Sequence, residues 1–306
     1  MTPGTRKLPN FFVVGAMKAG TGSLYDYLRA HPQIYMSRIK EPGYFSTDIR
    51  PPLDSHQRRL LAMPSDTLLG YVRVYDFDYY CRLFEGVGAE LAVGECSVSY
   101  LPSRTAATEI RSAVPHARII IVLRNPVERA YSHYLMNVRN EKAPLSFRNE
   151  LNRDRSKIEE TQLPKPYVQL GLYSEQVERY LNTFPSERVK IFLYEDIRDD
   201  FSKFIANVYD FLGVDGGFRP PKMKIRNQSR LPRSKLLNLL WVRTPLRDIV
   251  PRYLPEGMLA MAGRLHYSAK VPELSSADRE YLLEAFAPDI KKLERLINRE
   301  LKSWLH

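Results

Sequence analysis

Short apolar runs alternate with longer segments of helical periodicity along the 306-residue chain. The runs have the length and β-branched content of buried strands. They cover residues 11–14, 92–95, 118–123 and 189–194. Helical periodicity covers residues 23–30, 79–85, 105–113, 126–139, 174–184, 199–212 and 275–305, the last interrupted near Pro288. The alternation predicts an α/β fold with a central, largely parallel sheet flanked by helices.

Three irregular segments interrupt this alternation, at about residues 46–78, 140–168 and 213–270. The segment 140–168 is charged and poor in large apolar residues, which predicts a mobile insertion. One short helix is predicted near residues 56–63. Since no stretch has the composition of an interdomain linker, we predict a single domain over residues 1–306 with these segments as loop insertions.

Composition narrows the class of protein. The net charge of +11 favours anionic partners, namely nucleotides, polyanionic glycans, nucleic acid or acidic lipids, although plain solubility charge would look the same. No apolar run approaches the ~20 residues of a membrane span, and the N-terminus lacks the apolar region of a signal peptide. Cys81 and Cys96 are too few for a disulfide framework, so we expect a soluble protein of a reducing compartment, with a single bridge left open.

The loop after the first predicted strand carries the first candidate chemistry. Gly15 and Gly20 form the G-x-x-x-x-G frame of a phosphate-binding P-loop. A Walker A motif would continue with lysine and then serine or threonine, but here Thr21 and Gly22 follow and the lysine is Lys18, inside the loop. Amides before a helix N-terminus bind anions, so the loop suits a phosphate but not ordinary Mg-ATP chemistry. The alternative is a tight turn with a solvated lysine.

Two further segments carry polar groups that suit the same site. The run RIIIVLRNPVERAYSHY delivers Arg124 to the end of a strand, where open α/β sheets bind ligands, and places Ser132 on the next helix. Asn125 as N-cap and Pro126 at the first position predict where that helix begins. In the run Lys40-Glu41-Pro42, partial burial of Glu41 would raise its pKa toward that of a general base. A surface ion pair and an exposed loop glutamate are the alternatives for these two segments.

Taken together, the three motifs resemble the sulfotransferase family. They read G-x-x-K-x-G-T, K-E-P-x-x-F and L-R-N-P-x-x-R-A-x-S-H-Y, and with the C-terminal run they extend the resemblance over about residues 10–305. These enzymes use 3′-phosphoadenosine-5′-phosphosulfate (PAPS), and the chain is most similar to heparan-sulfate-type glycan sulfotransferases and their bacterial relatives. The resemblance implies a P-loop-like three-layer fold.

The resemblance also implies roles for individual residues. Lys18 would neutralise charge on the bridging oxygen as the sulfuryl group leaves, and Glu41 would accept the proton of the acceptor hydroxyl, with His133 as the next candidate base. The 5′-phosphate would lie against Ala19, Gly20, Thr21, Gly22 and Ser23, and the 3′-phosphate against Arg124 and Ser132. The run 227–234 would replace the family's C-terminal nucleotide loop, with Arg230 and Arg233 as phosphate contacts.

The chain departs from the family pattern at one acceptor-side position, and it offers no metal motif. Glu95-Cys96-Ser97-Val98 stands where several glycan sulfotransferases have Glu-Lys-(Ser/Thr)-Pro, so the family's lysine near the acceptor is missing. The six histidines are scattered and lack metal-ligand spacing, so we expect no metal.

The resulting expectation is an enzyme that moves the sulfuryl group of PAPS to a hydroxyl or amine of a carbohydrate or glycoconjugate, leaving PAP. One alternative is the same reaction on a lipid, polyketide or small natural-product hydroxyl. A P-loop kinase and a non-catalytic polyanion or nucleic-acid binder are alternatives of other classes, but no helix-turn-helix, zinc-finger or RNP-like pattern occurs. We expect a cytoplasmic bacterial protein, or alternatively a trimmed Golgi-luminal domain.

Overall fold

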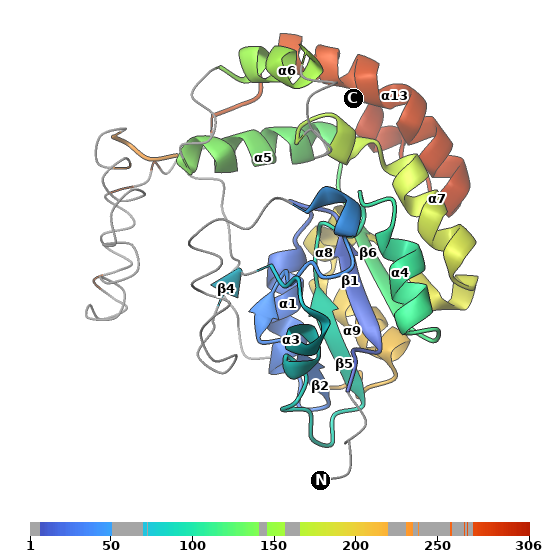
Figure 1. Ribbon diagram of the computed structural model, residues 1–306. Helices are drawn as coiled ribbons and strands as arrows, with labels where there is room; N and C mark the ends of the chain where they lie inside the picture. Colours follow the sequence, from blue (N-terminus) through green and yellow to red (C-terminus); the bar gives the residue numbers. More distant parts are fainter. Residues whose placement is uncertain are drawn as a thin grey trace.

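Five parallel strands form the centre of the molecule. The computed structural model describes residues 7–50, 70–71, 73–140, 146–156, 166–219, 231–234, 238, 258, 266, 268 and 272–306 (Figure 1). The sheet has the order β2-β5-β1-β6-β7. Its strands are β1 (Phe11–Gly15), β2 (Ile34–Met36), β5 (Ala92–Cys96), β6 (Arg118–Leu123) and β7 (Val189–Leu193). Every pairing in this sheet is parallel, which confirms the predicted α/β class.

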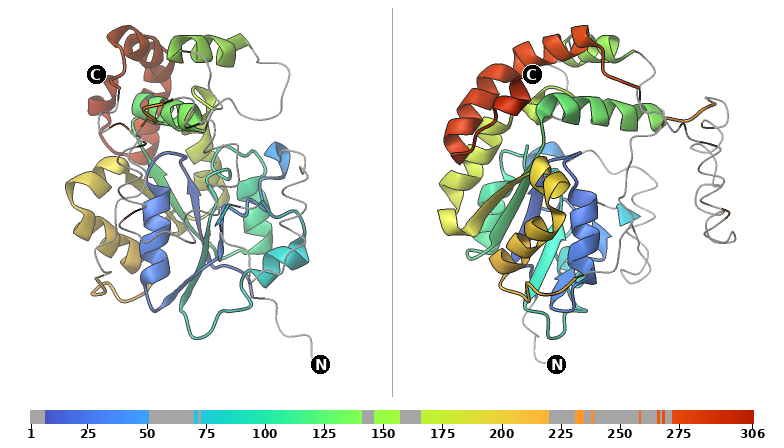
Figure 2. Two further views of the ribbon diagram at one scale, coloured as in Figure 1. Left: turned by 90° about the vertical axis from the view of Figure 1, so that its left-hand side faces the viewer. Right: turned by 180° about the vertical axis from the view of Figure 1, so that it is seen from behind.

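Helices cover both faces of this sheet. Figure 2 shows α1 (Thr21–Ala30), α8 (Tyr194–Asp199) and α9 (Phe201–Leu212) on one face, and α3 (Phe77–Arg82) and α4 (Ala106–Ala113) on the other. The helix α7 (Tyr173–Thr183) packs against α4. Three layers result, as the resemblance implies.

A further group of helices lies beyond the carboxyl ends of the strands (Figure 1). It consists of α5 (Pro126–Arg139), α6 (Phe147–Ser156) and α13 (Ser276–Ile297), which packs against both α5 and α7. Short elements complete the description: β3 (Ile39–Lys40), β4 (Gly70–Tyr71), and four 3-10 turns at Thr47–Ile49, Gln169–Gly171, Ser186–Arg188 and Lys302–Leu305.

The central strands are buried on both faces, which explains their continuous apolar sequences. All five residues of β1 and the last five of β6 are buried. Close packing between β1 and β5 depends on a glycine, because a Cβ at Gly94 would lie 2.1 Å from the ring of its partner Phe11. Any side chain at residue 94 would therefore displace the buried Phe11 ring.

Several boundaries differ from the sequence prediction. The predicted interruption at Pro288 is wrong, since α13 runs through it. The neighbouring Asp289 carboxylate accepts the backbone N–H groups of Tyr173 (2.7 Å) and Ser174 (3.2 Å), which ties the middle of α13 to the start of α7. The strand β2 and the helix α8 were not predicted, and Tyr194 opens α8 instead of ending a strand.

The segment 140–168 was predicted as a mobile insertion, but it contains α6. The buried positions of α6 mix apolar Phe147 and Leu151 with charged Glu150 and Asp154. The Asp154 carboxylate accepts the backbone N–H of Tyr167 at 3.2 Å. Because charged residues are buried in this way, α6 has little apolar periodicity, which explains why the sequence did not predict this helix. The short helix predicted near residues 56–63 lies outside the described residues.

Candidate functional site

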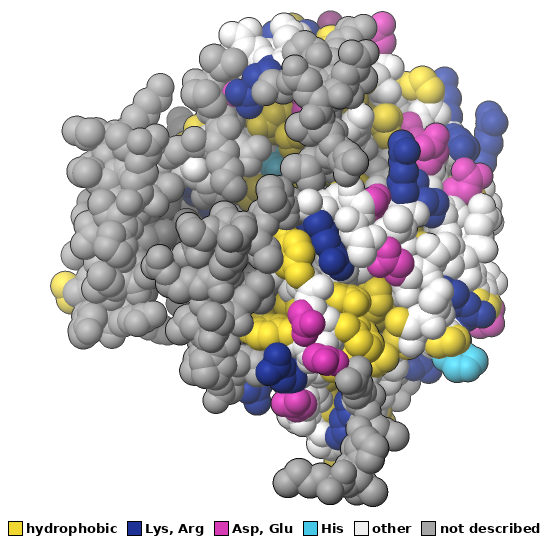
Figure 3. Space-filling view, viewed as in Figure 1, with side chains coloured by type: hydrophobic (Ala, Val, Ile, Leu, Met, Phe, Trp, Pro, Cys, Tyr) yellow, Lys and Arg dark blue, Asp and Glu magenta, His cyan; other side chains and the backbone are white. Residues whose placement is uncertain are grey.

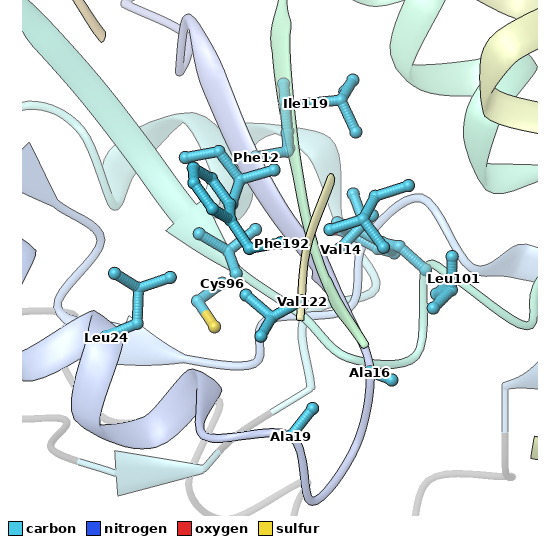
Figure 4. Packing of buried hydrophobic residues seen from close by; sticks show 14 of the residues in the cluster. Phe12, Val14, Ala16, Ala19, Leu24, Cys96, Leu101, Ile119, Val122 and Phe192 are labelled. Carbon is cyan, nitrogen blue, oxygen red and sulfur yellow. The ribbon is translucent and has the colours of Figure 1, made fainter. Parts of the chain in front are cut away.

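The loop between β1 and α1 lies at the carboxyl edge of the sheet. Two of its residues have left-handed backbones, Lys18 (φ 71°) and Gly20 (φ 89°). Glycine suits residue 20 for two reasons. It adopts a left-handed backbone without strain, and any Cβ at this position would lie 3.3 Å from the Ile197 side chain of α8. The methyl groups of Ala16 and Ala19 belong to the hydrophobic core, as Figure 4 shows beyond the end of β1.

The amides at the start of α1 are placed as the predicted anion nest requires. The first helical bond runs from Leu24 N–H to the Gly20 carbonyl (3.1 Å), so the amides of Thr21, Gly22 and Ser23 precede the helical ladder. The N-cap Gly20 has no side chain to cap them. The amide of Ala19 is donated inside the loop, to the Ala16 carbonyl at 3.1 Å, so this residue shapes the nest.

Lys18 lies in a strongly cationic environment. Burial lowers the pKa of its ammonium most, followed by the positive charges of Arg139, Arg124, Lys40 and Arg129, and together they bring it from 10.5 to about 8. Mutual repulsion among these side chains favours an anion that neutralises several of them at once. A phosphate or phosphosulfate has this chemistry.

Arg124 brings the second predicted motif against the loop. It follows β6 directly, and its Nη1 donates to the Lys18 carbonyl at 3.3 Å. Its guanidinium lies over the Tyr194 ring, 4.7 Å from the ring centre, and its Nη2 is 3.2 Å from Glu128 Oε2. The Tyr173 hydroxyl donates to the Arg124 carbonyl (3.1 Å), which fixes the backbone at this point. Lys18 and Arg124, which belong to two different predicted motifs, therefore lie together.

The first turns of α5 hold the remaining predicted residues of this motif. The Asn125 side chain accepts the Val127 amide at 3.0 Å, which confirms the predicted N-cap. Ser132 is buried on α5, one turn beyond Arg129. The fully buried Arg129 donates to the Pro166 carbonyl at 2.9 Å and lies 3.5 Å from His133 Nδ1.

His133 is itself buried, with its ring 5.7 Å from the ring of Tyr167. The contacts of His133 thus join α5 to the segment after α6. The proton-transfer role that the sequence suggested as a second choice for His133 stays a prediction.

Glu41 lies in a loop fastened to the end of β5. Its amide donates to the Cys96 carbonyl (2.9 Å), and the amides of Gly43 and Phe45 donate to Ser97 Oγ (3.0 Å) and the Tyr100 hydroxyl (3.3 Å). The Glu41 backbone is left-handed (φ 64°), an uncommon state for a residue with a side chain. The three hydrogen bonds of this loop hold Glu41 in that conformation.

The Glu41 carboxyl has the properties of a general base. Its side chain is 24% exposed, so Glu41 is largely removed from water without being sealed from it. Burial raises its pKa, while Lys40 and Arg73 act in the opposite direction. Lys40 Nζ lies 3.7 Å from Glu41 Oε1. A carboxylate of raised pKa is a stronger base once ionised.

The structure describes one of the two arginines predicted in the run 227–234. Arg230 lies outside the described residues. Arg233 is exposed, and its amide donates to the His266 carbonyl at 2.9 Å. Its phosphate-binding role stays a prediction.

The described part of the chain gives two further findings about ligands and membranes. Within it, no three His, Cys, Asp or Glu side chains lie close enough together to hold a metal ion. No described helix combines the length and apolar character needed to cross a bilayer. Both cysteines, Cys81 and Cys96, are buried free thiols.

Sequence reasoning missed two residues of this site, Tyr194 and Arg139. Tyr194 stacks under Arg124 from the first position of α8. Arg139 acts on Lys18 from the last position of α5. Neither lies in a motif, and only the packing of α8 and α5 over the loop brings them near it.

The sequence matches the Sulfotransferase family over residues 9–219, more than half of the chain. The chain therefore belongs to this family of transferase enzymes, which confirms the resemblance seen in the three motifs. Among solved structures it is similar to a sulfotransferase from Alicyclobacillus acidocaldarius, with 34% identity and a TM-score of 0.73 over 98% of this chain and 100% of that chain. Mouse sulfotransferase SULT7A1, solved in complex with PAP, shares the fold, with 13% identity and a TM-score of 0.51 over 95% of this chain and 87% of that chain.

Curated relatives include enzymes named for glycans. The chain is 25% identical over 293 residues to carbohydrate sulfotransferase 15 of Homo sapiens, covering 79% of this chain and 51% of that protein. It is 28% identical over 212 residues to human heparan sulfate glucosamine 3-O-sulfotransferase 6, covering 69% of this chain and 54% of that protein. This chain thus spans about half the length of these two relatives.

Proposed function

We propose that this protein transfers a sulfuryl group from PAPS to a hydroxyl or amine of a carbohydrate or glycoconjugate. The observation that carries the proposal is the position of Lys18 inside an anion nest. Four other cations lower the pKa of its ammonium, and Arg124 donates to its carbonyl. The PAP named in the mouse structure and the glycans named in the curated relatives support the choice of donor and acceptor.

The residues of the nest fit the donor chemically. The amides of Thr21, Gly22 and Ser23 would hold the 5′-phosphate, and Arg124 with Ser132 would hold the 3′-phosphate. PAPS would supply an activated sulfuryl group, whose bond to the bridging oxygen breaks as the bond to the acceptor forms. Lys18 would neutralise the charge that develops on the bridging oxygen.

Glu41 would serve the acceptor half of the reaction. Its carboxylate would accept the proton of the attacking hydroxyl, so that the acceptor ends as a sulfate ester and the base as a neutral acid. The bonds from Cys96, Ser97 and Tyr100 would hold this base in place during an in-line displacement.

Binding of PAP provides the first test. We expect PAP to raise the melting temperature by several degrees, because a ligand at roughly 100 times its Kd contributes about 2.7 kcal/mol. ATP should give a much smaller shift. Radiolabelled PAPS should then label a glycan acceptor in a panel that also contains phenols and lipids. Labelling of a lipid alone would replace the proposed acceptor, and salt-dependent nucleic-acid binding without any response to PAP would favour a non-catalytic binder.

Replacement of Lys18 tests the mechanism. Lys18→Ala should abolish transfer and leave the fold intact, since a loop ammonium contributes little to packing. Lys190→Ala, which removes an exposed lysine from β7, is the matched control and should retain full activity. Near-normal sulfation by Lys18→Ala would contradict the proposed role of the loop.

On the face shown in Figure 3, the distribution of charged side chains does not support the alternative of a nucleic-acid binder. Where the face shown in Figure 3 is not grey, basic and acidic side chains are interspersed. The positive excess of the whole chain therefore does not form a continuous basic patch on that part of the surface.

A further inference from the structure

Lys40 lies beside the proposed base in an arrangement that regular strand geometry would not allow. It is the second residue of β3, which pairs in parallel with β4 through Lys40 and Tyr71. Side chains of successive strand residues point to opposite faces. The left-handed φ of Glu41 breaks this alternation, so that the neighbouring side chains meet with Lys40 Nζ 3.7 Å from Glu41 Oε1.

The ammonium of Lys40 is also well removed from solvent. Its side chain is 12% exposed, half the exposure of Glu41. A flexible lysine held in this way loses conformational entropy, which a solvated surface lysine would keep. The Glu41 amide is fixed to the Cys96 carbonyl at 2.9 Å, so the ion pair is anchored on its backbone side as well.

The Glu41 loop and the donor loop are held next to each other by Cys96. Its carbonyl accepts the Glu41 amide at 2.9 Å, and its thiol donates to the Thr21 carbonyl at 3.8 Å. Lys40 and Arg73 are the charges that lower the pKa of Glu41. The charges that lower the pKa of Lys18 are those of Arg139, Arg124, Lys40 and Arg129. Lys40 is common to both sets.

We propose that Lys40 is a positioning residue shared by the donor lysine and the acceptor base: it orients the Glu41 carboxylate and couples its charge to that of Lys18. The inference rests on the proposed function, because it takes Lys18 and Glu41 in the roles given there. Activity requires Glu41 ionised and Lys18 protonated. The charge of Lys40 favours the ionised base and the neutral lysine, so it moves both limits of the active pH range downward together.

The pH dependence of kcat/KM tests the coupling. In Lys40→Met both limbs of the profile should move to higher pH, the acid limb by roughly half to one unit for a charge 3.7 Å from the carboxylate in a partly hydrated site. Lys40→Arg should keep both limbs near their wild-type positions, because the charge is retained. A purely structural lysine would lower the rate without moving either limb.

Two matched variants distinguish the effect of charge on Glu41 from its effect on Lys18. Arg73→Met should move only the acid limb, because Arg73 faces Glu41. Arg139→Met should move only the alkaline limb, because Arg139 faces Lys18. Movement of both limbs in Lys40→Met, with one limb moving in each control, would establish the coupling.

Binding of PAP across the same pH range gives a readout that needs no acceptor. The alkaline fall in PAP affinity, measured by calorimetry, follows the loss of charge at Lys18 without involving an acceptor, and its midpoint should move upward in Lys40→Met. If neither limb nor this midpoint moves in a folded Lys40→Met protein, the inference is overturned. Full turnover by Glu41→Gln would instead overturn the proposed base, and the PAP midpoint would still decide the link between Lys40 and Lys18.

Discussion

Replacing Glu95 by glutamine should stabilise the protein at neutral pH. Glu95 is completely buried in β5, among the phenol rings of Tyr80 and Tyr100. Burial raises the pKa of its carboxyl from 4.5 to about 8, against the opposing influence of the two hydroxyls. The native protein therefore holds a neutral acid that ionises when the chain unfolds, and glutamine is a neutral side chain of the same shape.

The sign and size of the effect follow from proton linkage. Between pH 4.5 and about 8 the native state binds one more proton at Glu95 than the unfolded state does. The wild-type free energy of unfolding should therefore fall by about 1.4 kcal/mol per pH unit from this residue, until the pH passes its folded-state pKa. Between about pH 5 and pH 7.5 the loss amounts to roughly 3 kcal/mol, and Glu95→Gln should escape it.

Urea unfolding across this pH range measures the difference directly. The two proteins should be similar near pH 5, and the variant should become progressively more stable above it. Glu187→Gln, at an exposed position in the 3-10 turn before β7, controls for the loss of one carboxyl from the chain. Parallel stability curves for wild type and Glu95→Gln would refute the reasoning, because they would show that Glu95 is ionised in the native state.

Three further predictions concern the site and its support. Glu41→Gln should lower kcat by roughly 100-fold or more and leave the KM for PAPS nearly unchanged, as steady-state kinetics would show; unchanged turnover would move the base elsewhere. Arg124→Met should weaken PAP binding roughly 10-fold or more in calorimetry, because charged hydrogen bonds to phosphate are lost, and an unaltered Kd would remove Arg124 from the nucleotide site. Asp289→Ala should cost about 1–3 kcal/mol in urea unfolding, since the amides of Tyr173 and Ser174 lose their acceptor; a smaller loss would mean that water replaces the carboxylate.

The sequence by itself determined the parts of this protein that depend on local signals. The apolar run 118–123 with Asn125 and Pro126 gave the bounds of β6 and α5 as the structure has them. Strand propensity, a capping side chain and the fixed φ of proline all act within a few residues of the chain, so local reading suffices. The unusual position of Lys18 inside the loop could be recognised from the sequence for the same reason, because the whole motif spans only a few residues.

Only the tertiary structure decided which charged groups meet and how they ionise. Lys18 and Arg124 are 106 residues apart, and only the parallel pairing of β1 with β6 brings them to the same edge of the sheet. The charged helix α6 and the neutral Glu95 were hidden from the sequence for a related reason. Desolvation and long-range partners determine the free energy of a buried charge, and neither produces a periodic pattern in the amino-acid sequence.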